Sequence, residues 1–192
     1  MPAPSVTPHL RVLAIDDAPF ARRPAAPVPL VAVLSRGARH VEAVFSTRVR
    51  RDGWRATEAI TTMVEAHDIA RQARCILLDG IAVGGFNLVD LPRLAANTAT
   101  PVIAVMRKAP DLVAMRAAMA KVSSPDRRWR FVEAAGPIHR AQHGLFQCAG
   151  CEPAWARDVL AMTTVDAHYP EPLRLAHLIG AGVVLGRSRS RA

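Results

Sequence analysis

Two short aliphatic stretches of the sequence each end on an aspartate. The stretch RVLAI is followed by Asp16 and Asp17, and the stretch CILL is followed by Asp79. All-aliphatic runs of this length are typical of strands that are buried on both faces of a sheet. If the two strands are parallel neighbours, Asp16 and Asp79 leave the same edge of the sheet about 4.8 Å apart.

Two carboxylates at this separation repel each other unless they share a proton or a cation. Mg²⁺ or Mn²⁺ relieves the repulsion because a hard divalent ion takes oxygen ligands and keeps several waters. Such ions support phosphodiester hydrolysis by activating the attacking water and stabilising the leaving oxygen. The competing interpretation of each aspartate, taken singly, is a helix N-cap or a turn residue. The pair predicts a metal site with Asp16 and Asp79 as ligands.

The charge of the chain favours a polyanionic partner. Lys and Arg number 25 against 16 acidic residues, which gives a net charge of +9, and most of the cations are arginines, whose forks match phosphate oxygens. DNA or RNA is therefore the expected partner, and a scattered, solvated arginine surface is the alternative. Arg107 and Lys108 follow the strand-like run PVIAVM and are expected at the same sheet edge, either beside a bound strand or in a solvated loop.

The pattern of apolar residues predicts an α/β fold in a single domain spanning 11–187. We expect a loose segment at 1–10, a basic tail at 188–192, and an ambiguous stretch at 127–150. Expected strands are 11–16, 28–35, 40–50, 75–79, 101–106 and a short one in GLFQC at 144–148. Expected helices are one from Ala56, then 88–97, 112–122, 153–162 and 172–186.

Three early strands with tight connections predict an antiparallel meander, and later strands separated by helices are expected to join in parallel. This is the mixed sheet of the ribonuclease H-like fold, in which the fourth strand lies beside the first. No apolar run is long enough for a membrane span and no secretory signal is evident, so we expect no membrane association and a cytoplasmic protein.

Several motifs resemble those of one family. AIDDAPF, DGWRAT, ILLDGIAVGGFNLVD, PVIAVMRKAPDL and PEPLRLAHLI resemble the motifs of the DUF-ninety-nine proteins, also called endonuclease dU, over residues 11–191. That family is similar to endonuclease V, a ribonuclease H-like enzyme that nicks nucleic acid near deaminated bases. The resemblance implies a divalent-metal-dependent endonuclease acting on DNA or RNA.

The resemblance also implies roles for individual residues. Asp16 and Asp79 match the two strand-end metal carboxylates, and Arg107 stands where endonuclease V has a lysine. His177 matches a residue of the final helix at the far side of the metal, although a histidine on an apolar helix is otherwise a packing residue. Endonuclease V has a further metal-binding glutamate at a helix start, for which Glu58 and Asp52 compete.

The sequence departs from the family patterns at two points. Arg55 stands where the pattern DG-x-D-A-T has an acid, which leaves the third carboxylate open. The proline-and-tyrosine wedge by which endonuclease V senses a lesion is absent, so the resemblance does not imply specificity for uracil or hypoxanthine.

Further candidate contacts surround these acids. Gly84 and Gly85 allow close approach of the backbone to a nucleic acid, and Phe86 or Asn87 could stack on or hydrogen-bond a displaced base. The alternative is an ordinary tight turn with Phe86 in the core. Arg174, in the PEPLRLAH motif, is a further candidate contact to nucleic acid.

The spacing H-x₃-H-x₄-C-x₂-C offers four competent ligands for a structural zinc ion. The residues are His139, His143, Cys148 and Cys151. The alternative without a metal is a buried pair of thiols with exposed histidines.

Three functions remain in competition on the sequence alone. The first is the metal-dependent endonuclease, the second a non-catalytic nucleic-acid-binding protein with the same fold, and the third an enzyme acting on a small phosphate compound. The sequence leaves the oligomeric state open.

Overall fold

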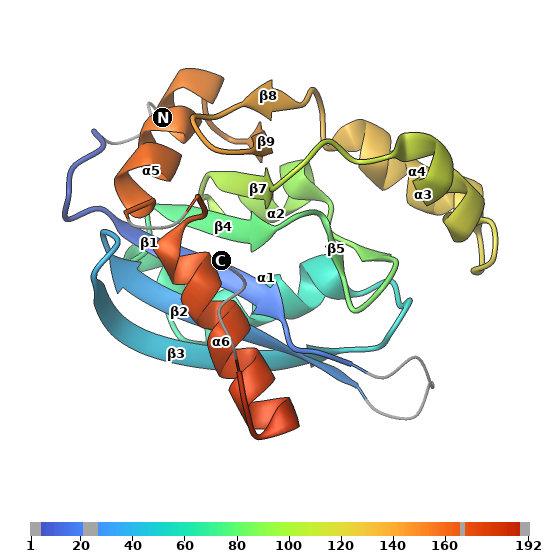
Figure 1. The fold of residues 1–192 in the computed structure, drawn as a ribbon, viewed down its shortest axis with the longest axis horizontal. Coiled ribbons are helices and arrows are strands. Elements are labelled where there is room, and N and C mark those ends of the chain that lie inside the picture. Colours follow the sequence, from blue (N-terminus) through green and yellow to red (C-terminus); the bar gives the residue numbers. More distant parts are fainter. Residues whose placement is uncertain (1–4, 21–26, 166–167, 189–192) are drawn as a thin grey trace.

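A computed structural model describes residues 5–20, 27–165 and 168–188. Its centre is a seven-stranded mixed sheet of order β3-β2-β1-β4-β7-β9-β8 (Figure 1). The strands of this sheet are β1 (Arg11–Asp17), β2 (Val28–Arg36), β3 (His40–Val49), β4 (Cys75–Asp79), β7 (Val102–Met106), β8 (His139–Arg140) and β9 (Leu145–Ala149). A separate two-stranded ribbon consists of β5 (Ala82–Val83) and β6 (Asn87–Leu88). The ribonuclease H-like α/β class predicted from the sequence is confirmed.

The strand pairing places β1 and β4 as predicted. β1, β2 and β3 form an antiparallel meander, and β4 runs parallel to β1 with Ile15 opposite Leu78. β7 then runs parallel to β4. Since Asp16 and Asp79 directly follow Ile15 and Leu78, the two aspartates end neighbouring strands at the same edge of the sheet.

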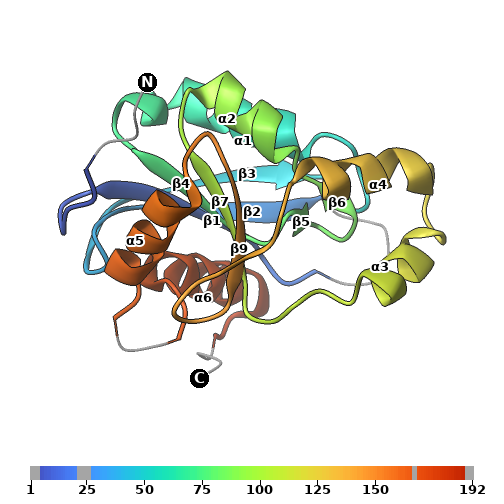
Figure 2. The same ribbon diagram turned by 90° about the horizontal axis from the view of Figure 1, so that it is seen from above.

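The last strands differ from the prediction, because β9 runs antiparallel to β7, with Met106 opposite Leu145. Between them the chain forms α3 (Leu112–Met119) and α4 (Pro125–Ala134), which lie beyond the end of the sheet and do not cross its face (Figure 2). The chain therefore re-enters the sheet at the end where β7 stops and has to run back. The ambiguous stretch 127–150 contains the rest of α4, β8 and β9.

Helices cover both faces of the sheet (Figure 2). α1 (Ala56–Ala66) and α2 (Leu91–Thr98) cover one face, and α5 (Pro153–Thr163) and α6 (Glu171–Leu185) cover the other, while a single 3₁₀ turn spans Ile69–Arg71. None of the helices in the described ranges is both long and apolar enough to cross a membrane.

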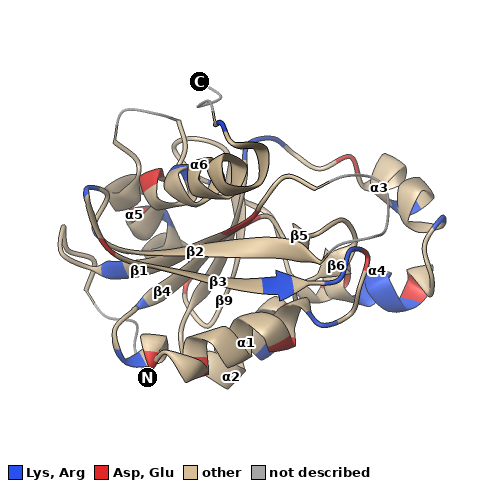
Figure 3. Cartoon of the chain, turned by 90° about the horizontal axis from the view of Figure 1, so that it is seen from below, with Lys and Arg blue, Asp and Glu red and all other residues tan. Residues whose placement is uncertain are grey.

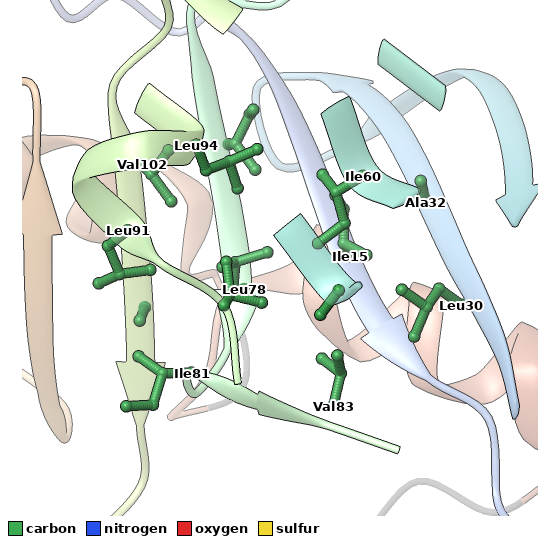
Figure 4. Close-up of a cluster of buried hydrophobic side chains, with 14 of the residues drawn as sticks. Ile15, Leu30, Ala32, Ile60, Leu78, Ile81, Val83, Leu91, Leu94 and Val102 are labelled. Atoms are coloured by element: carbon green, nitrogen blue, oxygen red, sulfur yellow. The ribbon is translucent and has the colours of Figure 1, made fainter. Parts of the chain in front are cut away.

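Each face of the sheet has its own apolar core. The core under α1 and α2 includes Ile15, Leu30, Ala32, Ile60, Leu78, Ile81, Val83, Leu91, Leu94 and Val102 (Figure 4). The core on the α5 side includes Val12, Ala14, Leu77, Phe146, Val159 and Leu173. Because successive residues of a strand point to opposite faces, β1 and β4 contribute to both cores, which explains why Val12–Ile15 and Ile76–Leu78 are all aliphatic.

The last residue before β1, Leu10, is packed against the fold. Leu10 is buried, its N–H donates to the carbonyl of Thr7, and its carbonyl accepts from the N–H of Gly37. Leu10 is thus anchored to the turn between β2 and β3, and the loose segment at 1–10 stays a prediction for the residues before it. Residues 1–4, and residues 189–192 of the predicted basic tail, lie outside the described ranges.

Candidate functional site

The pleat of two neighbouring strands directs Asp16 and Asp79 to the same face of the sheet. Alternate residues of a strand point to the same face, so Asp16 points the same way as Val12 and Ala14 on β1. Asp79 likewise points the same way as Leu77 on β4. Both side chains therefore point toward the α6 layer. Asp17, one residue further along β1, points toward the opposite layer. The chain thereby brings three carboxylates to one edge of the sheet.

Asp16 and Asp17 are both perturbed by their surroundings. Asp16 is only 5% exposed, and burial raises its pKa to about 8, with further contributions from the negative charges of Asp79 and Asp17. Burial also raises the pKa of Asp17, against the hydrogen bond that Asp17 accepts from the backbone of Gly84. The positive charge of Arg107 acts in the opposite direction on Asp16. In the metal-free protein the surroundings of Asp16 therefore favour its protonated form.

Helix α6 supplies a partner to Asp16. The Nδ1 atom of His177 lies 2.9 Å from Oδ2 of Asp16, whose Oδ1 accepts from the N–H of Asp17 at 2.8 Å. α6 approaches β1 this closely because Gly180 faces Ala18, where an added Cβ would lie 3.1 Å from the Cα of Ala18. The structure thus places His177 of the final helix beside Asp16, and its role at a metal stays a prediction.

Asp79 has a different partner, Tyr169. The phenol of Tyr169 donates to Oδ1 of Asp79 at 2.5 Å, and the guanidinium of Arg107 lies 4.4 Å from the centre of the Tyr169 ring. Burial raises the pKa of Tyr169 far above its usual value, and the charge of Asp79 adds to the effect, so the phenol keeps its proton and remains a donor. Arg107 therefore stands beside the acidic cluster, held against an aromatic ring.

The donor set of this cluster fits a hard divalent cation. Within the described ranges, no three His, Cys, Asp or Glu side chains form a metal-binding group, and each of the three aspartates already accepts a hydrogen bond or contacts a histidine. Mg²⁺, however, commonly binds through one or two carboxylates and takes its other ligands from water and substrate phosphates. Asp16 and Asp79 provide two such oxygen donors, and their mutual repulsion favours a cation between them.

Glu58 and Asp52 are not part of this cluster, contrary to the prediction that one of them would be the third carboxylate. Glu58 lies on α1, which covers the opposite face of the sheet, and pairs with Arg93 at 2.9 Å. Asp52 accepts from the N–H of Phe86 at 2.8 Å and pairs with Arg51 at 3.2 Å. Neither forms a metal-binding group with Asp16 and Asp79 among the described side chains.

The glycine-rich loop is held by its neighbours. Gly84 and Gly85 have φ angles of +55° and +85°, and an added Cβ at Gly85 would lie 2.3 Å from Oδ1 of Asp52. Asn87 is fully buried, and its amide accepts from the N–H of Ala56 and donates to the carbonyl of Arg50. The amide of Asn87 therefore joins the loop to the start of α1 and is not free for a base.

The other predicted contacts have different surroundings. Phe86 is half-buried against the core beneath α1, which agrees with the tight-turn alternative. Lys108 is exposed just after β7. Arg174 forms an ion pair with Glu171 one turn earlier on α6, with its Nε 2.7 Å from the carboxylate.

The four predicted zinc ligands do not form one group. The thiol of Cys148 donates to the carbonyl of Cys151 at 3.8 Å, the ring of His139 packs on Phe146, and the ring of His143 stacks on His168. All four lie in described ranges, in which no three such side chains could hold a metal. The structural zinc prediction is therefore not supported, and both cysteines are free thiols.

Sequence reasoning missed two members of the site. In the sequence Asp17 is evident only as the neighbour of Asp16, although an Asp–Asp pair at a strand end presents one carboxylate to each face. Tyr169 is the single tyrosine of the chain and directly precedes the PEPLRLAH motif. Its place beside this motif was the only feature of the sequence that could have indicated a role for Tyr169 in the site.

Solved structures of endonuclease V share the mixed α/β fold of this chain. Endonuclease V from Bacillus subtilis aligns with a TM-score of 0.57 at 11% identity, covering 92% of this chain and 82% of that one. Endonuclease V from Ciona intestinalis, in complex with a 23mer DNA containing an inosine followed by a ribo-adenosine, aligns with a TM-score of 0.55 at 12% identity, covering 86% and 81%. The protein thus has the endonuclease V fold.

The chain belongs to the endonuclease dU family, whose model matches residues 8–184. A UPF0215 protein from Methanothermobacter thermautotrophicus is 43% identical over 188 residues, which cover 96% of this chain and 92% of that protein. A relative from Deinococcus radiodurans is 39% identical over 98% and 96% of the two chains. A protein of unknown function from Archaeoglobus fulgidus has a crystal structure that aligns with a TM-score of 0.85 at 34% identity, covering 91% and 98%.

Proposed function

We propose that this protein is a divalent-metal-dependent endonuclease that hydrolyses phosphodiester bonds in DNA or RNA. The observation that carries the proposal is the buried Asp16 beside Asp79 at the ends of adjacent parallel strands, with the pKa of Asp16 raised to about 8. A cation is the simplest group that stabilises ionised carboxylates in such a position. Membership in the endonuclease dU family and the endonuclease V fold support the same conclusion.

Mg²⁺ or Mn²⁺, when bound, would activate water and neutralise charge on the phosphate. Asp16 and Asp79 would hold the ion, and His177 and Tyr169 would orient the two carboxylates through their contacts at 2.9 and 2.5 Å. Arg107, stacked on Tyr169, is positioned to interact with a phosphate oxygen. Two carboxylates would thus be the metal ligands, two further side chains would position them, and Arg107 would supply a positive charge to the phosphate.

The substrate is proposed to be a nucleic-acid polymer containing a deaminated base. The net charge of +9 favours a polyanion over a small phosphate compound. Hypoxanthine is the first base to test because the DNA bound to the Ciona endonuclease V contains inosine. Uracil is the second, because it is the deamination product of cytosine.

A cleavage panel tests this proposal. Single- and double-stranded DNA and RNA, each with hypoxanthine, uracil or no modified base, are incubated with Mg²⁺, Mn²⁺ or EDTA. We expect metal-dependent nicks that decrease by at least about 100-fold in Asp79→Asn, on the scale of losing one charged group at a reacting centre. Asp158→Asn, which changes an exposed aspartate on α5, is the matched control and keeps full activity. Full activity in Asp79→Asn would refute the proposal.

A non-catalytic nucleic-acid-binding protein is the second candidate function. It is favoured by one observation: each of the three aspartates already has a partner, and no three-ligand group exists among the described residues. Its signature is salt-sensitive binding without any nick in Mg²⁺ or Mn²⁺. A metal-dependent nick eliminates this candidate.

A further inference from the structure

An arginine-lined hollow of about 990 Å³ lies on the α1 face of the sheet, away from the face to which Asp16 and Asp79 point. It is bounded by the end of β3, the loop after it, the start of α1 and the connection between α3 and α4. Its lining includes Arg48, Arg50, Arg51, Trp54, Arg55 and Ser123.

Most of these arginines have no acidic partner. Arg51 pairs with Asp52 at 3.2 Å, whereas Arg48, Arg50 and Arg55 form no ion pair within the described ranges. The acid on the α1 side of the hollow, Glu58, is already paired with Arg93. Figure 3 shows basic segments both at the end of β3 and in α4, next to this region. The hollow therefore carries uncompensated positive charge.

A buried cation fixes the walls of the hollow. The side chain of Arg128 is fully buried, and its guanidinium donates to the carbonyl oxygens of Asp52, Gly53, Phe86 and Ser123. All four acceptors are neutral, so these bonds do not cancel its charge. Arg127 and Arg128 also stack on Trp54, at 4.7 and 4.0 Å from the ring centre. The hollow is thus pre-organised, and its aromatic ring is already stacked with guanidinium groups and not left open for a base.

The hollow and the acidic cluster are mechanically connected through Gly84. Its N–H donates to Oδ2 of Asp17 at 2.6 Å, and its carbonyl accepts from the N–H of Asp52 at 2.9 Å. Asp17 belongs to the acidic cluster, and Asp52 lines the hollow. One residue therefore joins the two regions, so a strand held in the hollow has a fixed position relative to the acids.

We propose that this hollow binds the phosphodiester backbone of the nucleic acid, with Arg48, Arg50 and Arg55 contacting its phosphates. Guanidinium groups without acidic partners match phosphate oxygens, and a pre-formed site loses little entropy on binding. The inference rests on the proposed function for the identity of the partner. It concerns binding, however, and is tested without cleavage.

The experiment measures binding of a fluorescent oligonucleotide by anisotropy in EDTA over a range of KCl concentrations. Each phosphate contact contributes close to one unit to the slope of log K against log salt. We expect the double variant R50A/R55A to reduce this slope by about two units, alike for every oligonucleotide sequence. The control R39A/R74A removes the same charge from exposed arginines at the opposite edge of the sheet and leaves the slope within about half a unit of wild type. Thermal unfolding verifies that all variants are folded.

Equal slopes in the two double variants would overturn the inference, since binding would then depend on diffuse charge. Displacement of the oligonucleotide by an equal concentration of a mononucleotide would also overturn it, in favour of a small phosphate ligand. No binding by the wild-type protein would reject both this inference and the proposed function. If R50A/R55A lowers the salt slope as expected but the wild-type protein produces no nick, the result supports nucleic-acid binding in the hollow and rejects only the proposed nuclease activity.

Discussion

Tyr169 donates a hydrogen bond to Asp79 at 2.5 Å, although ninety residues separate the two in the sequence. Tyr169 lies just before α6, and the same helix brings His177 to 2.9 Å from Asp16. One C-terminal segment therefore supplies a partner to each of the two strand-end aspartates. The PEPLRLAH motif thus spans the segment between the two partners. It begins directly after Tyr169, the partner of Asp79, and ends on His177, the partner of Asp16.

Tyr169→Phe tests the positioning role of the phenol. Removing the hydroxyl leaves the ring that contacts Arg107 but deprives Asp79 of its donor. Hydrogen bonds to charged groups contribute about 1.5–3 kcal/mol, which corresponds to a loss of roughly 10–100-fold in Mn²⁺ affinity if the bond orients the ligand. Calorimetric titration with Mn²⁺ measures this loss without reference to cleavage.

A fall in catalytic rate at unchanged Mn²⁺ affinity would contradict a positioning role and assign the phenol to a later step. Asp79→Asn is the reference variant, because it removes the carboxylate itself.

The raised pKa of Asp16 makes stability depend on pH. In the metal-free protein the folded state keeps a proton on Asp16 up to about pH 8, whereas the unfolded chain loses it near pH 4. The folded state binds more protons between these values, so the free energy of unfolding falls as pH rises from about 4 to 8, by at most about 1.4 kcal/mol per pH unit.

Urea unfolding at several pH values, in EDTA and in Mg²⁺, measures this dependence. Asp16→Asn abolishes its share of the slope, and Mg²⁺ flattens the slope in the wild type because the cation replaces the proton. A wild-type slope that Asp16→Asn leaves unchanged would show that other groups are responsible.

The glycine loop provides a matched pair of variants. Gly85→Ala and Gly80→Ala both place a Cβ at positive φ, which costs about 1 kcal/mol in each. Only at Gly85 does the new Cβ meet Oδ1 of Asp52, at 2.3 Å, whereas nothing lies within 4 Å at Gly80. The carboxylate has to rotate and release the N–H of Phe86, so we expect Gly85→Ala to lose about 1–2 kcal/mol more. Equal losses in urea unfolding would contradict this role of Asp52.

The sequence predicted the parts of this structure that depend on local pattern. Aliphatic runs predicted the central strands. The expected parallel pairing of two of them predicted that Asp16 and Asp79 lie at the same edge of the sheet. The direction of β9 depends on where α3 and α4 return the chain, which no local pattern encodes. The course of the chain through this region was accordingly the part predicted wrongly.

The site was harder to predict because the type of a polar residue does not reveal which groups it hydrogen-bonds or pairs with in the folded protein. Glu58, Asp52 and Asn87 have suitable chemistry, yet their polar atoms bind Arg93, Phe86, Ala56 and Arg50. Tyr169 had no motif of its own, because its role arises only when its segment reaches the end of β4. Tertiary contacts of this kind distinguish a functional acid from a structural one.

The fully buried Arg128 leads to a final prediction about stability. Arg128→Met keeps the volume but removes the donors for four carbonyl groups of three separate loops. Leaving a buried acceptor without its donor costs about 1–3 kcal/mol, so the loss at several carbonyl groups is expected to lower Tm by at least roughly 6 °C for a chain of this size.

Arg130→Met, on an exposed position of α4, is the control and changes Tm little. Arg128→Lys separates charge from geometry, because an ammonium group keeps the charge but presents three donors and no planar fork. If the fork matters, Arg128→Lys unfolds nearly as early as Arg128→Met; if the charge alone matters, it unfolds close to wild type. A wild-type Tm in Arg128→Met would mean that the loops around the hollow hold their own shape, and the pre-organisation assigned to Arg128 would be wrong.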